Sequence, residues 1–234
     1  MGVMQRSAAS GRKAGTGLRE RKKQETRDRL AHIATLLFIE RGFDNVTITE
    51  VAEAADVSKM TVTNYFPLKE DLVFDAHELV VDSLARTVRE RLPGESALHG
   101  LRRAFLSALG GGYPVLTGHA SPGFARLVHD SARLRARERE IDEQREEALA
   151  EALAAATGTA PDGLATLLAA AQLAAAHRVL FRLVRSLDRA DTPPAEADRL
   201  AAAAAEDAFD RLEPVLGTYA VRPDDAPPAP GPRP

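Results

Sequence analysis

A run of polar side chains between positions 58 and 65 has the residue types and spacing to hydrogen-bond the base edges of DNA. A helix that enters the major groove needs small polar or donor side chains near its N-terminus, because that end approaches the bases most closely. Lys59 can donate to guanine or to a phosphate, and Asn64 can pair with adenine. The candidates for base contact are Lys59, Met60, Thr61, Thr63 and Asn64. The alternative for each residue is an ordinary solvated helix face.

Two short helices with their own start signals are predicted to hold these side chains. Thr47 is placed to cap the first helix, and Glu50, three residues later, completes a capping box. The apolar face of this helix consists of Ile48, Val51 and Ala55. Residues 54–57 form the turn, and Ser58 caps the second helix. That helix directs Val62 and Phe66 inward, so the pattern predicts a helix-turn-helix.

The segments on either side of this unit are predicted to support it. A helix that begins between Leu18 and Glu25 runs to Arg41 and ends at Gly42. Its predicted core stripe is Leu30, Ile33, Ala34, Leu37 and Phe38. After Pro67, residues 69–72 are expected to open a long helix that continues to about residue 91.

Residues 25–72 resemble the DNA-binding domain of TetR-type transcriptional regulators, over about a fifth of the chain. The motifs that carry the resemblance are Phe38 with Arg41-Gly42-Phe43, the helix led by Thr47, Val57-Ser58, Tyr65-Phe66-Pro67 and Lys69-Glu70-Asp71-Leu72. The resemblance implies an all-helical homodimer whose larger C-terminal domain binds a small molecule that usually relieves repression. It also implies that Thr47, Thr49, Tyr65 and the helix start at Lys69 hold phosphates of the DNA.

Of the 234 residues, 44% are hydrophobic, which is enough for a core. The absence of Trp, an aromatic content of 5% and the many Ala, Leu, Glu and Arg residues favour an all-α protein. The net charge of −3 hides a basic N-terminus, in which residues 1–29 carry nine Lys and Arg against three acids. Such a segment can neutralise phosphates, or it can serve only solubility. We expect a disordered arm at 1–17, the helix-turn-helix domain at 18–68, an effector and dimerisation domain at 69–220, and a disordered Pro-rich tail at 221–234.

Further helices are predicted at about 95–109, 121–130, 131–156, 162–188 and 194–216, separated by Gly- and Pro-rich loops near residues 110–114 and 117–122. The last two helices are rich in Ala. Small side chains let helices approach closely, so two helices from each subunit can form a four-helix dimer interface. The alternative is that Ala reflects only helix propensity.

A ligand pocket, if present, is expected among apolar side chains with a few polar groups, which suits a hydrophobic ligand. The candidates are Phe74, His77, Phe105, Leu116, Phe124, Leu127, His129 and His177. For each of them, plain core packing is the competing interpretation. Arg178, Arg182 and Arg185 are candidates for an acidic ligand, or for surface and interface ion pairs. The C-terminal region also resembles, in general terms, the regulators with acyl-CoA-like ligand-binding domains.

Catalysis is disfavoured because the chain has no Cys, no glycine-rich phosphate loop and six His without metal-ligand spacing. We therefore expect no cofactor and no metal. The N-terminus lacks an apolar signal segment, and the longest apolar run is too short to span a bilayer, so a cytoplasmic protein without a membrane partner is expected. The remaining rival is a constitutive DNA-binding dimer that has no small-molecule effector.

Overall fold

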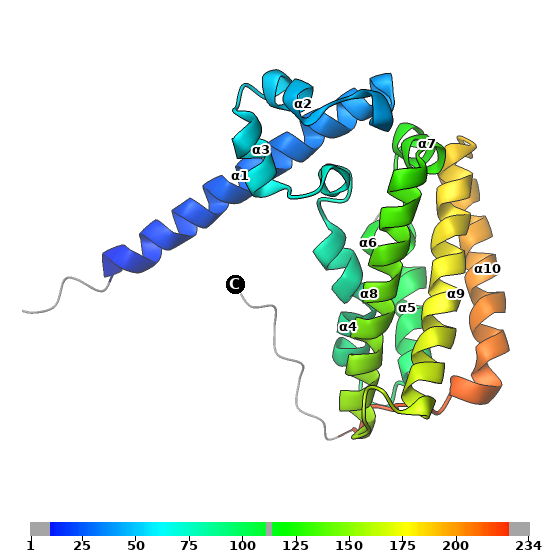
Figure 1. Cartoon of the computed structure of the whole chain (residues 1–234). Coiled ribbons are helices and arrows are strands. Elements are labelled where there is room, and N and C mark those ends of the chain that lie inside the picture. The colour runs from blue at the N-terminus through cyan, green and yellow to red at the C-terminus, as the bar shows by residue number, and fades with distance from the viewer. Residues whose placement is uncertain (1–9, 111–113, 225–234) are drawn as a thin grey trace, which may run out of the picture. The chain divides into compact units, whose positions relative to one another are not determined.

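The computed structural model describes residues 10–110 and 114–224, and helices are the only regular secondary structure among them. The all-α prediction is therefore confirmed (Figure 1). The chain divides into two compact units, residues 1–75 and residues 76–234. The helices of the N-terminal unit are α1 (Ser10–Arg41), η1 (Phe43–Asn45), α2 (Ile48–Ala54), α3 (Lys59–Tyr65) and η2 (Lys69–Leu72).

The core of the N-terminal unit forms where α1 meets the short helices. α1 ends at Arg41 because Gly42 adopts a φ of 86°, which reverses the chain at little steric cost. The reversal brings the ring of Phe43 edge-on to that of Phe38, with centroids 5.0 Å apart. Val62 and Phe66 are buried in the same unit, as predicted. Of the predicted α1 stripe, Leu30, Ala34 and Phe38 are fully buried, whereas Ile33 and Leu37 are half-buried.

Two sequence-based boundaries in this unit were wrong. α1 begins at Ser10, so residues 10–17 are helical where a disordered arm was expected; residues 1–9 lie outside the described residues. The continuous helix expected from residue 69 to residue 91 is instead the 3-10 turn η2, followed after a break by α4 (His77–Glu90). Residues 69–75 consequently belong to the N-terminal unit.

The break after η2 has a physical cause in side chains of α1. Thr35 Oγ1 donates to the carbonyl of Leu72 at 3.4 Å, and Arg27 Nη2 donates to the carbonyl of Asp75 at 3.3 Å. These carbonyls therefore have acceptor contacts outside a helical ladder, and Leu72 itself is fully buried. Long-range contacts thus override a local pattern that favours helix.

The C-terminal unit contains α4, α5 (Ala97–Ala108), α6 (Pro114–Thr117), α7 (Pro122–Asp130), α8 (Ala132–Thr157), α9 (Leu164–Arg189) and α10 (Pro194–Leu216). The long helices pack in a closed ring, in which α4 contacts α8, α8 contacts α9, α9 contacts α10, α10 contacts α5 and α5 contacts α4. The five predicted helices beyond residue 94 end within a few residues of those observed. The four-residue helix α6 was not predicted.

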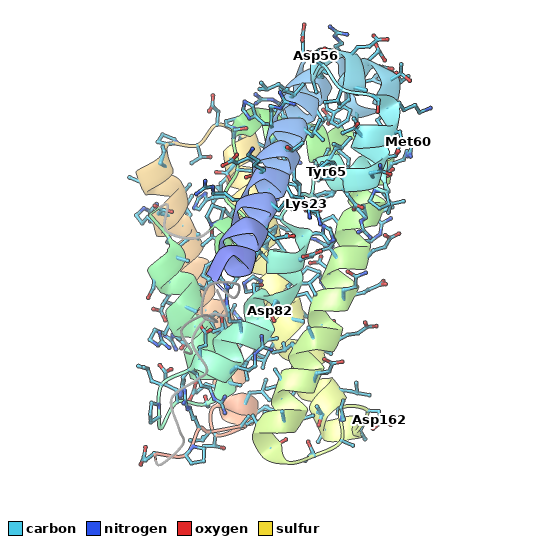
Figure 2. The ribbon with its side chains drawn as sticks, turned by 90° about the vertical axis from the view of Figure 1, so that its left-hand side faces the viewer. Lys23, Asp56, Met60, Tyr65, Asp82 and Asp162 are labelled. Carbon is cyan, nitrogen blue, oxygen red and sulfur yellow. The ribbon has the colours of Figure 1, made fainter. Side chains whose placement is uncertain are left out.

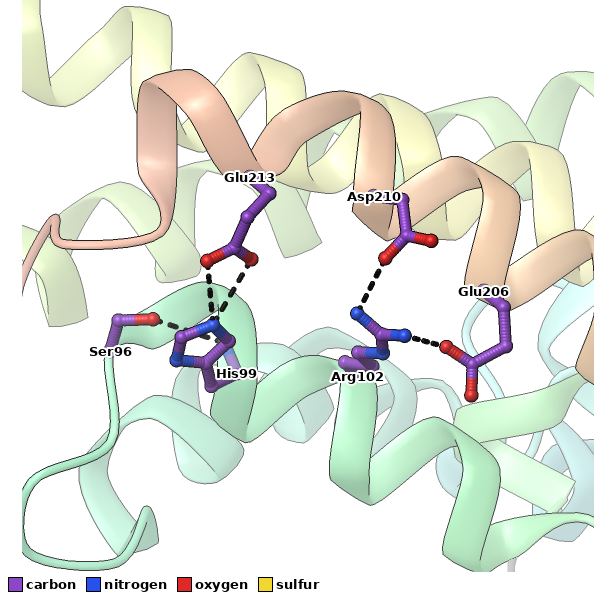
Figure 3. A network of polar contacts seen from close by, with 6 residues as sticks. All are labelled: Ser96, His99, Arg102, Glu206, Asp210 and Glu213. Atoms are coloured by element: carbon purple, nitrogen blue, oxygen red, sulfur yellow. Dashed lines mark hydrogen bonds and ion pairs between the residues drawn. The ribbon is translucent and has the colours of Figure 1, made fainter.

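Polar contacts join α5 to α10 on the outside of this ring (Figure 3). His99 Nε2 lies 3.0 Å from Glu213 Oε1, and Arg102 Nη1 lies 2.8 Å from Asp210 Oδ1. Arg102 also pairs with Glu206. Because the three acids follow one another at helical spacing, they form a ladder along one face of α10. The register of the two helices is thereby fixed.

The chain after α10 returns to the α4–α5 turn. The N–H of Arg222 donates to the Glu95 carbonyl, and the N–H of Gly94 donates to the Arg222 carbonyl, each at 2.9 Å. The prediction of a disordered tail was therefore wrong for residues 221–224, while residues 225–234 lie outside the described residues.

One described helix, α9, is long and apolar enough by composition to cross a membrane. Almost half of its apolar window (44%) is buried inside the protein, where Ala169, Ala170 and Leu173 pack into the core. The packing of α9 in the helical ring thus accounts for the buried part of its apolar character.

Candidate nucleic-acid interface and C-terminal cavity

The turn between α2 and α3 sets the direction in which α3 leaves the first helix. Asp56 has a φ of 52°, a left-handed conformation that Asp tolerates better than most residues. The N–H of Val57 donates to the carbonyl of Ala52 at 3.0 Å. Ser58 Oγ then accepts from the N–H of Thr61 at 3.0 Å and caps α3. The predicted turn and second cap are both present.

α3 buries one face and exposes the other. Val62 is completely buried, while Met60 on the opposite face is 72% exposed (Figure 2). The outward-facing side chains that the sequence analysis selected for base contact are Lys59, Met60, Thr63 and Asn64, all of them exposed. Thr61 is half-buried, and its hydroxyl lies 2.8 Å from Ser58 Oγ, so Ser58 and Thr61 serve the cap.

The hydroxyl of Thr63 is already oriented by its own helix. Its Oγ1 donates to the carbonyl of Met60 at 3.1 Å. The hydroxyl proton is therefore used, and what remains for a partner outside α3 is an acceptor lone pair and the methyl group. Those groups suit a base amino group or a thymine methyl.

The hydroxyl and the backbone N–H of Thr47 are both used in the cap of α2. Its Oγ1 accepts from the N–H of Glu50 at 3.2 Å, and its own N–H donates to Glu50 Oε2 at 2.7 Å, which completes the predicted capping box. Hydrogen bonds from the Thr47 backbone, and then from its side chain, lower the pKa of Glu50. Thr49 is exposed on the first turn of α2. Of these two threonines, Thr49 is the better placed for a phosphate, because Thr47 is committed to the cap.

Tyr65 and Lys69 differ from each other in their surroundings. The Tyr65 side chain is half-exposed, and its carbonyl accepts from Arg27 Nη1 at 3.0 Å. Lys69 Nζ donates to the carbonyl of Phe43 and lies 4.2 Å from the centroid of the Phe43 ring. The Lys69 ammonium therefore bonds within the domain, and η2 is too short to offer the helix N-terminus that was expected there.

A cavity of about 230 Å³ lies between α7, α8 and α9 in the C-terminal unit. Its lining is strongly basic rather than apolar. The lining residues are Ala125, Val128, His129, Arg135, Glu138, Arg182, Arg185, Ser186 and Arg189. Of the eight residues predicted for a pocket, His129 alone lines this cavity, where Arg189 donates to its Nδ1. Arg182 and Arg185 were named as candidates for an acidic ligand.

The other predicted pocket residues are scattered. Phe74 belongs to the N-terminal unit and His77 is the first residue of α4. Leu116 and Phe124 are half-buried, and Leu127 is buried. Phe105 and His177 lie edge-on with ring centroids 5.8 Å apart, as core neighbours. Arg178 lies 3.9 Å from Glu146, at ion-pair distance. Apart from His129, the predicted set therefore does not line the cavity between α7, α8 and α9.

Outside the cavity lining, α8 and α9 bury an unusual pair of polar side chains, Arg145 and His177. Arg145 is 1% exposed, and its Nη2 donates to Asp142 at 2.5 Å, but its Nε and Nη1 meet no partner among the described residues. Neither ring nitrogen of His177 is paired there either. Burial, and then the charge of Arg145, hold the pKa of His177 well below its ordinary value, against a weak opposing effect of the Leu116 backbone. His177 is therefore neutral near pH 7.

A periodic signal for the cavity is present in the sequence. Residues 182, 185, 186 and 189 recur at helical spacing, which brings them to one face of α9, and residues 135 and 138 do the same on α8. The sequence analysis selected Arg182 and Arg185 but not Arg135, Arg189 or Glu138, because nothing in the sequence indicates that these two faces meet.

Comparison with known proteins agrees with the geometry of the N-terminal unit. The model for bacterial regulatory proteins of the tetR family matches residues 32–76. The HTH-type transcriptional regulator TcmR of Streptomyces glaucescens is 32% identical over 96 residues, which span 41% of this chain and 42% of that protein. The match thus covers less than half of the length of this curated relative.

Solved structures resemble a larger part of the chain, at lower sequence identity. A TetR-family regulator from Mesorhizobium loti is 21% identical with a TM-score of 0.50, over 81% of this chain and 97% of that one. FadR from Bacillus subtilis, solved in complex with stearoyl-CoA, is 17% identical with a TM-score of 0.48, over 77% of this chain and 96% of that one. The first similarity bears on the fold alone, and the second is too low to bear on the ligand.

These relatives are regulators and not enzymes, which agrees with the prediction that the chain is not an enzyme. Three observations now coincide: a capped helix-turn-helix, an exposed polar face on its second helix, and a larger helical unit that follows it in the sequence. With the family match over residues 32–76, they identify the N-terminal unit as a DNA-binding domain of the tetR type.

Proposed function

We propose that this protein is a homodimeric repressor that binds operator DNA through α3 and releases it when a small molecule occupies the C-terminal unit. The observation that carries the DNA-binding part is the two-sided character of α3. Val62 and Phe66 anchor the helix in the core, whereas Lys59, Thr63 and Asn64 remain exposed. A helix held in this way can enter a major groove without loss of folding contacts.

The contacts divide by their expected role. Lys59, Met60, Thr63 and Asn64 are proposed to contact bases, with Thr61 and Ser58 setting the start of the helix. Thr49 and Tyr65 are proposed to hold phosphates, together with the basic N-terminal segment. Lys69 and Thr47 act mainly by fixing the domain, since their polar groups are bonded within it.

Fluorescence anisotropy with a labelled duplex from the region upstream of the protein's own gene tests this proposal. Asn64→Ala should weaken binding by about 5- to 150-fold, because one good bidentate base contact is worth about 1–3 kcal/mol. Lys59→Ala should weaken binding as well, and it should lessen the salt dependence if Lys59 meets a phosphate. Arg199→Ala removes an exposed charge from α10 and serves as the control. Absence of binding to any DNA would overturn the proposal.

The small-molecule part has a rival, a constitutive DNA-binding dimer without an effector. The sequence analysis favoured a hydrophobic effector, and an acyl-CoA-like ligand remains a prediction. A thermal-shift screen followed by a DNA-release assay on each hit separates the two. Ligands that raise the melting temperature and lower DNA affinity support a ligand-responsive repressor, whereas stabilising ligands without effect on DNA affinity support the rival. A cytoplasmic location is the natural one for such a regulator.

A further inference from the structure

The cavity between α7, α8 and α9 carries a surplus of positive charge. Four arginines line it, from α8 (Arg135) and from α9 (Arg182, Arg185, Arg189), against a single acid, Glu138, among the described residues that line it. Like charges that line one cavity repel each other, so such a cluster is stable only with counter-charges or a bound anion. Glu138 offsets part of this charge, and Asp188, outside the lining, also acts on Arg185 as a counter-charge.

Arg185 is the fixed member of this cluster. Its Nε donates to the carbonyl of Gly118 at 2.7 Å, and its guanidinium lies over the rings of Phe124 and Phe181 at 4.9 and 5.3 Å. These contacts fix the position of the Arg185 guanidinium but leave one of its hydrogen-bond donors unused, because Nη1 is buried and has no partner among the described residues. A buried donor left unpaired is costly, so an acceptor is expected at this position.

The remaining groups define what that acceptor is. Arg182 is exposed and makes no hydrogen bond or ion pair with any described residue, so its charge is available to a ligand. Burial raises the pKa of Glu138, and Arg185 and Arg182 act in the opposite direction. No hydrogen bond joins Glu138 to either arginine among the described residues. The Arg185 guanidinium is therefore not hydrogen-bonded to the one acid among the described residues of the cavity lining.

Size and wall chemistry limit the ligand further. A cavity of about 230 Å³ is smaller than the roughly 300–1,000 Å³ of pockets that take drug-sized molecules. Ala125 and Val128 add a small apolar wall on α7. The space thus suits a compact organic body with one anionic group.

We propose that the effector of this regulator is a small organic acid whose carboxylate binds between Arg182 and Arg185 in this cavity. The proposal rests on the proposed ligand-responsive function and gives its ligand class. The carboxylate pairs with the guanidinium of Arg185, and Arg182 supplies the second positive charge. Charge-assisted pairing of this kind distinguishes an acid from its neutral isostere.

Isothermal titration calorimetry of the full chain with benzoate and with benzamide tests the ligand class, because the two probes share their shape and differ in charge. Benzoate should bind with one site per chain and at least about tenfold more tightly than benzamide. Equal binding of the two probes would overturn the proposal, and so would the absence of saturable benzoate binding to folded protein.

Two variants with opposite expected effects locate the site. Arg182→Gln should weaken benzoate binding at least about tenfold, and Glu138→Gln should tighten it about threefold, because it removes the acid that competes with the ligand. Arg199→Gln and Glu143→Gln are the matched controls on exposed positions outside the cavity and should leave the affinity unchanged. Arg185 itself is avoided because it also supports the fold. If the affinity for benzoate is the same in both cavity variants as in wild type, the ligand binds elsewhere and the proposal is overturned.

The same titrations separate this inference from the function on which it rests. If benzoate follows the expected pattern but leaves the DNA affinity unchanged, the acid site stands and ligand-responsive release fails. If DNA affinity responds to other ligands while benzoate does not bind, release stands and the acid site fails.

Discussion

Tyr65 and Phe66 are neighbours in the sequence with different roles. Phe66 is 1% exposed, and the guanidinium of Arg27 lies 4.5 Å from the centre of its ring. The side chain of Tyr65 is half-exposed at the end of α3. One residue therefore holds α3 in place, and the other is available for the DNA backbone.

Separate substitutions at these two aromatic residues should distinguish an effect on stability from an effect on DNA binding. Phe66→Ala should lower the free energy of unfolding by about 3–5 kcal/mol, because it removes a fully buried ring. Tyr65→Phe should leave the stability nearly unchanged and weaken DNA binding. Urea unfolding and anisotropy on the same samples check both. A large loss of stability in Tyr65→Phe would assign Tyr65 to the core instead.

A second contrast at the scale of residues concerns the buried pair of Asp142 and Arg145. Burial lowers the pKa of Arg145, and Asp142 opposes this effect. Asp142→Ala leaves the guanidinium buried without its counter-charge, so we expect a loss of about 3–5 kcal/mol in the free energy of unfolding. Replacement of both residues, Asp142→Leu with Arg145→Met, should be close to neutral, since no buried charge remains.

Urea denaturation of the single and double variants measures this difference. If the double variant is as unstable as the single one, the pair contributes packing or contacts that apolar side chains do not replace. The unpaired Nε and Nη1 of Arg145 favour a double variant of nearly wild-type stability, because the hydrogen-bonding groups of the wild-type pair are themselves incompletely satisfied.

At the scale of elements, local signals located most helices and long-range contacts decided the rest. Ser58 and Ser131 mark helix starts by side chains that bond within three residues, so the sequence contains the whole interaction. The end of η2 depends on Thr35 and Arg27, which are 37 and 48 residues away from their acceptors. No local pattern contains those contacts, and the predicted helix from 69 to 91 failed there.

The same distinction applies to the candidate site. The exposed face of α3 could be predicted because its helical period and its cap are local. The cavity could not, since it forms where a face of α9 meets a face of α8 that lies more than 40 residues earlier. The sequence shows that these arginines are charged, but it does not show that those on α8 and those on α9 lie close together.

The capping box of α2 gives a prediction about pH. The pKa of Glu50 is lowered by its bonds to Thr47, so folding favours the charged carboxylate. A carboxyl group with a depressed folded pKa stabilises the protein at pH values above its ordinary pKa, and that contribution is lost as the pH falls through the folded value. Glu50→Gln should therefore be less stable than wild type at pH 7, and the difference should shrink towards pH 3.

Melting temperatures of wild type and Glu50→Gln at several pH values check this, with Glu53→Gln, an exposed acid on the same helix, as the control. Only the difference between variant and wild type is informative, because the pKa values of Glu95 and Asp207 are also lowered, each chiefly by its side-chain hydrogen bonds to an arginine. A difference that does not change with pH would mean that the negative charge of Glu50 contributes nothing to stability.

At the scale of the whole molecule, the distribution of Ala and Leu on α9 points to a partner. Many of the alanines that suggested a dimer interface, among them Ala169, Ala170 and Ala174, pack inside the chain itself. The apolar side chains that α9 leaves exposed are larger than alanine: Leu164 is 75% and Val179 is 63% exposed. With Leu168 they lie within about 60° of one another around the helix axis, which forms one apolar stripe.

An apolar stripe of this kind is costly in water and is typical of an interface that a second copy covers. We therefore predict that Leu168→Glu converts a dimer into a folded monomer, which light scattering coupled to size-exclusion chromatography measures directly. Leu92→Glu, at an exposed leucine of the α4–α5 turn, is the control and should remain dimeric. Because a helix-turn-helix dimer binds two half-sites at once, the monomeric variant should also lose most of its operator affinity at equal protein concentration. A Leu168→Glu protein that stays dimeric would place the interface on another surface, whereas a monomeric variant with undiminished DNA affinity would show that one helix-turn-helix unit is sufficient.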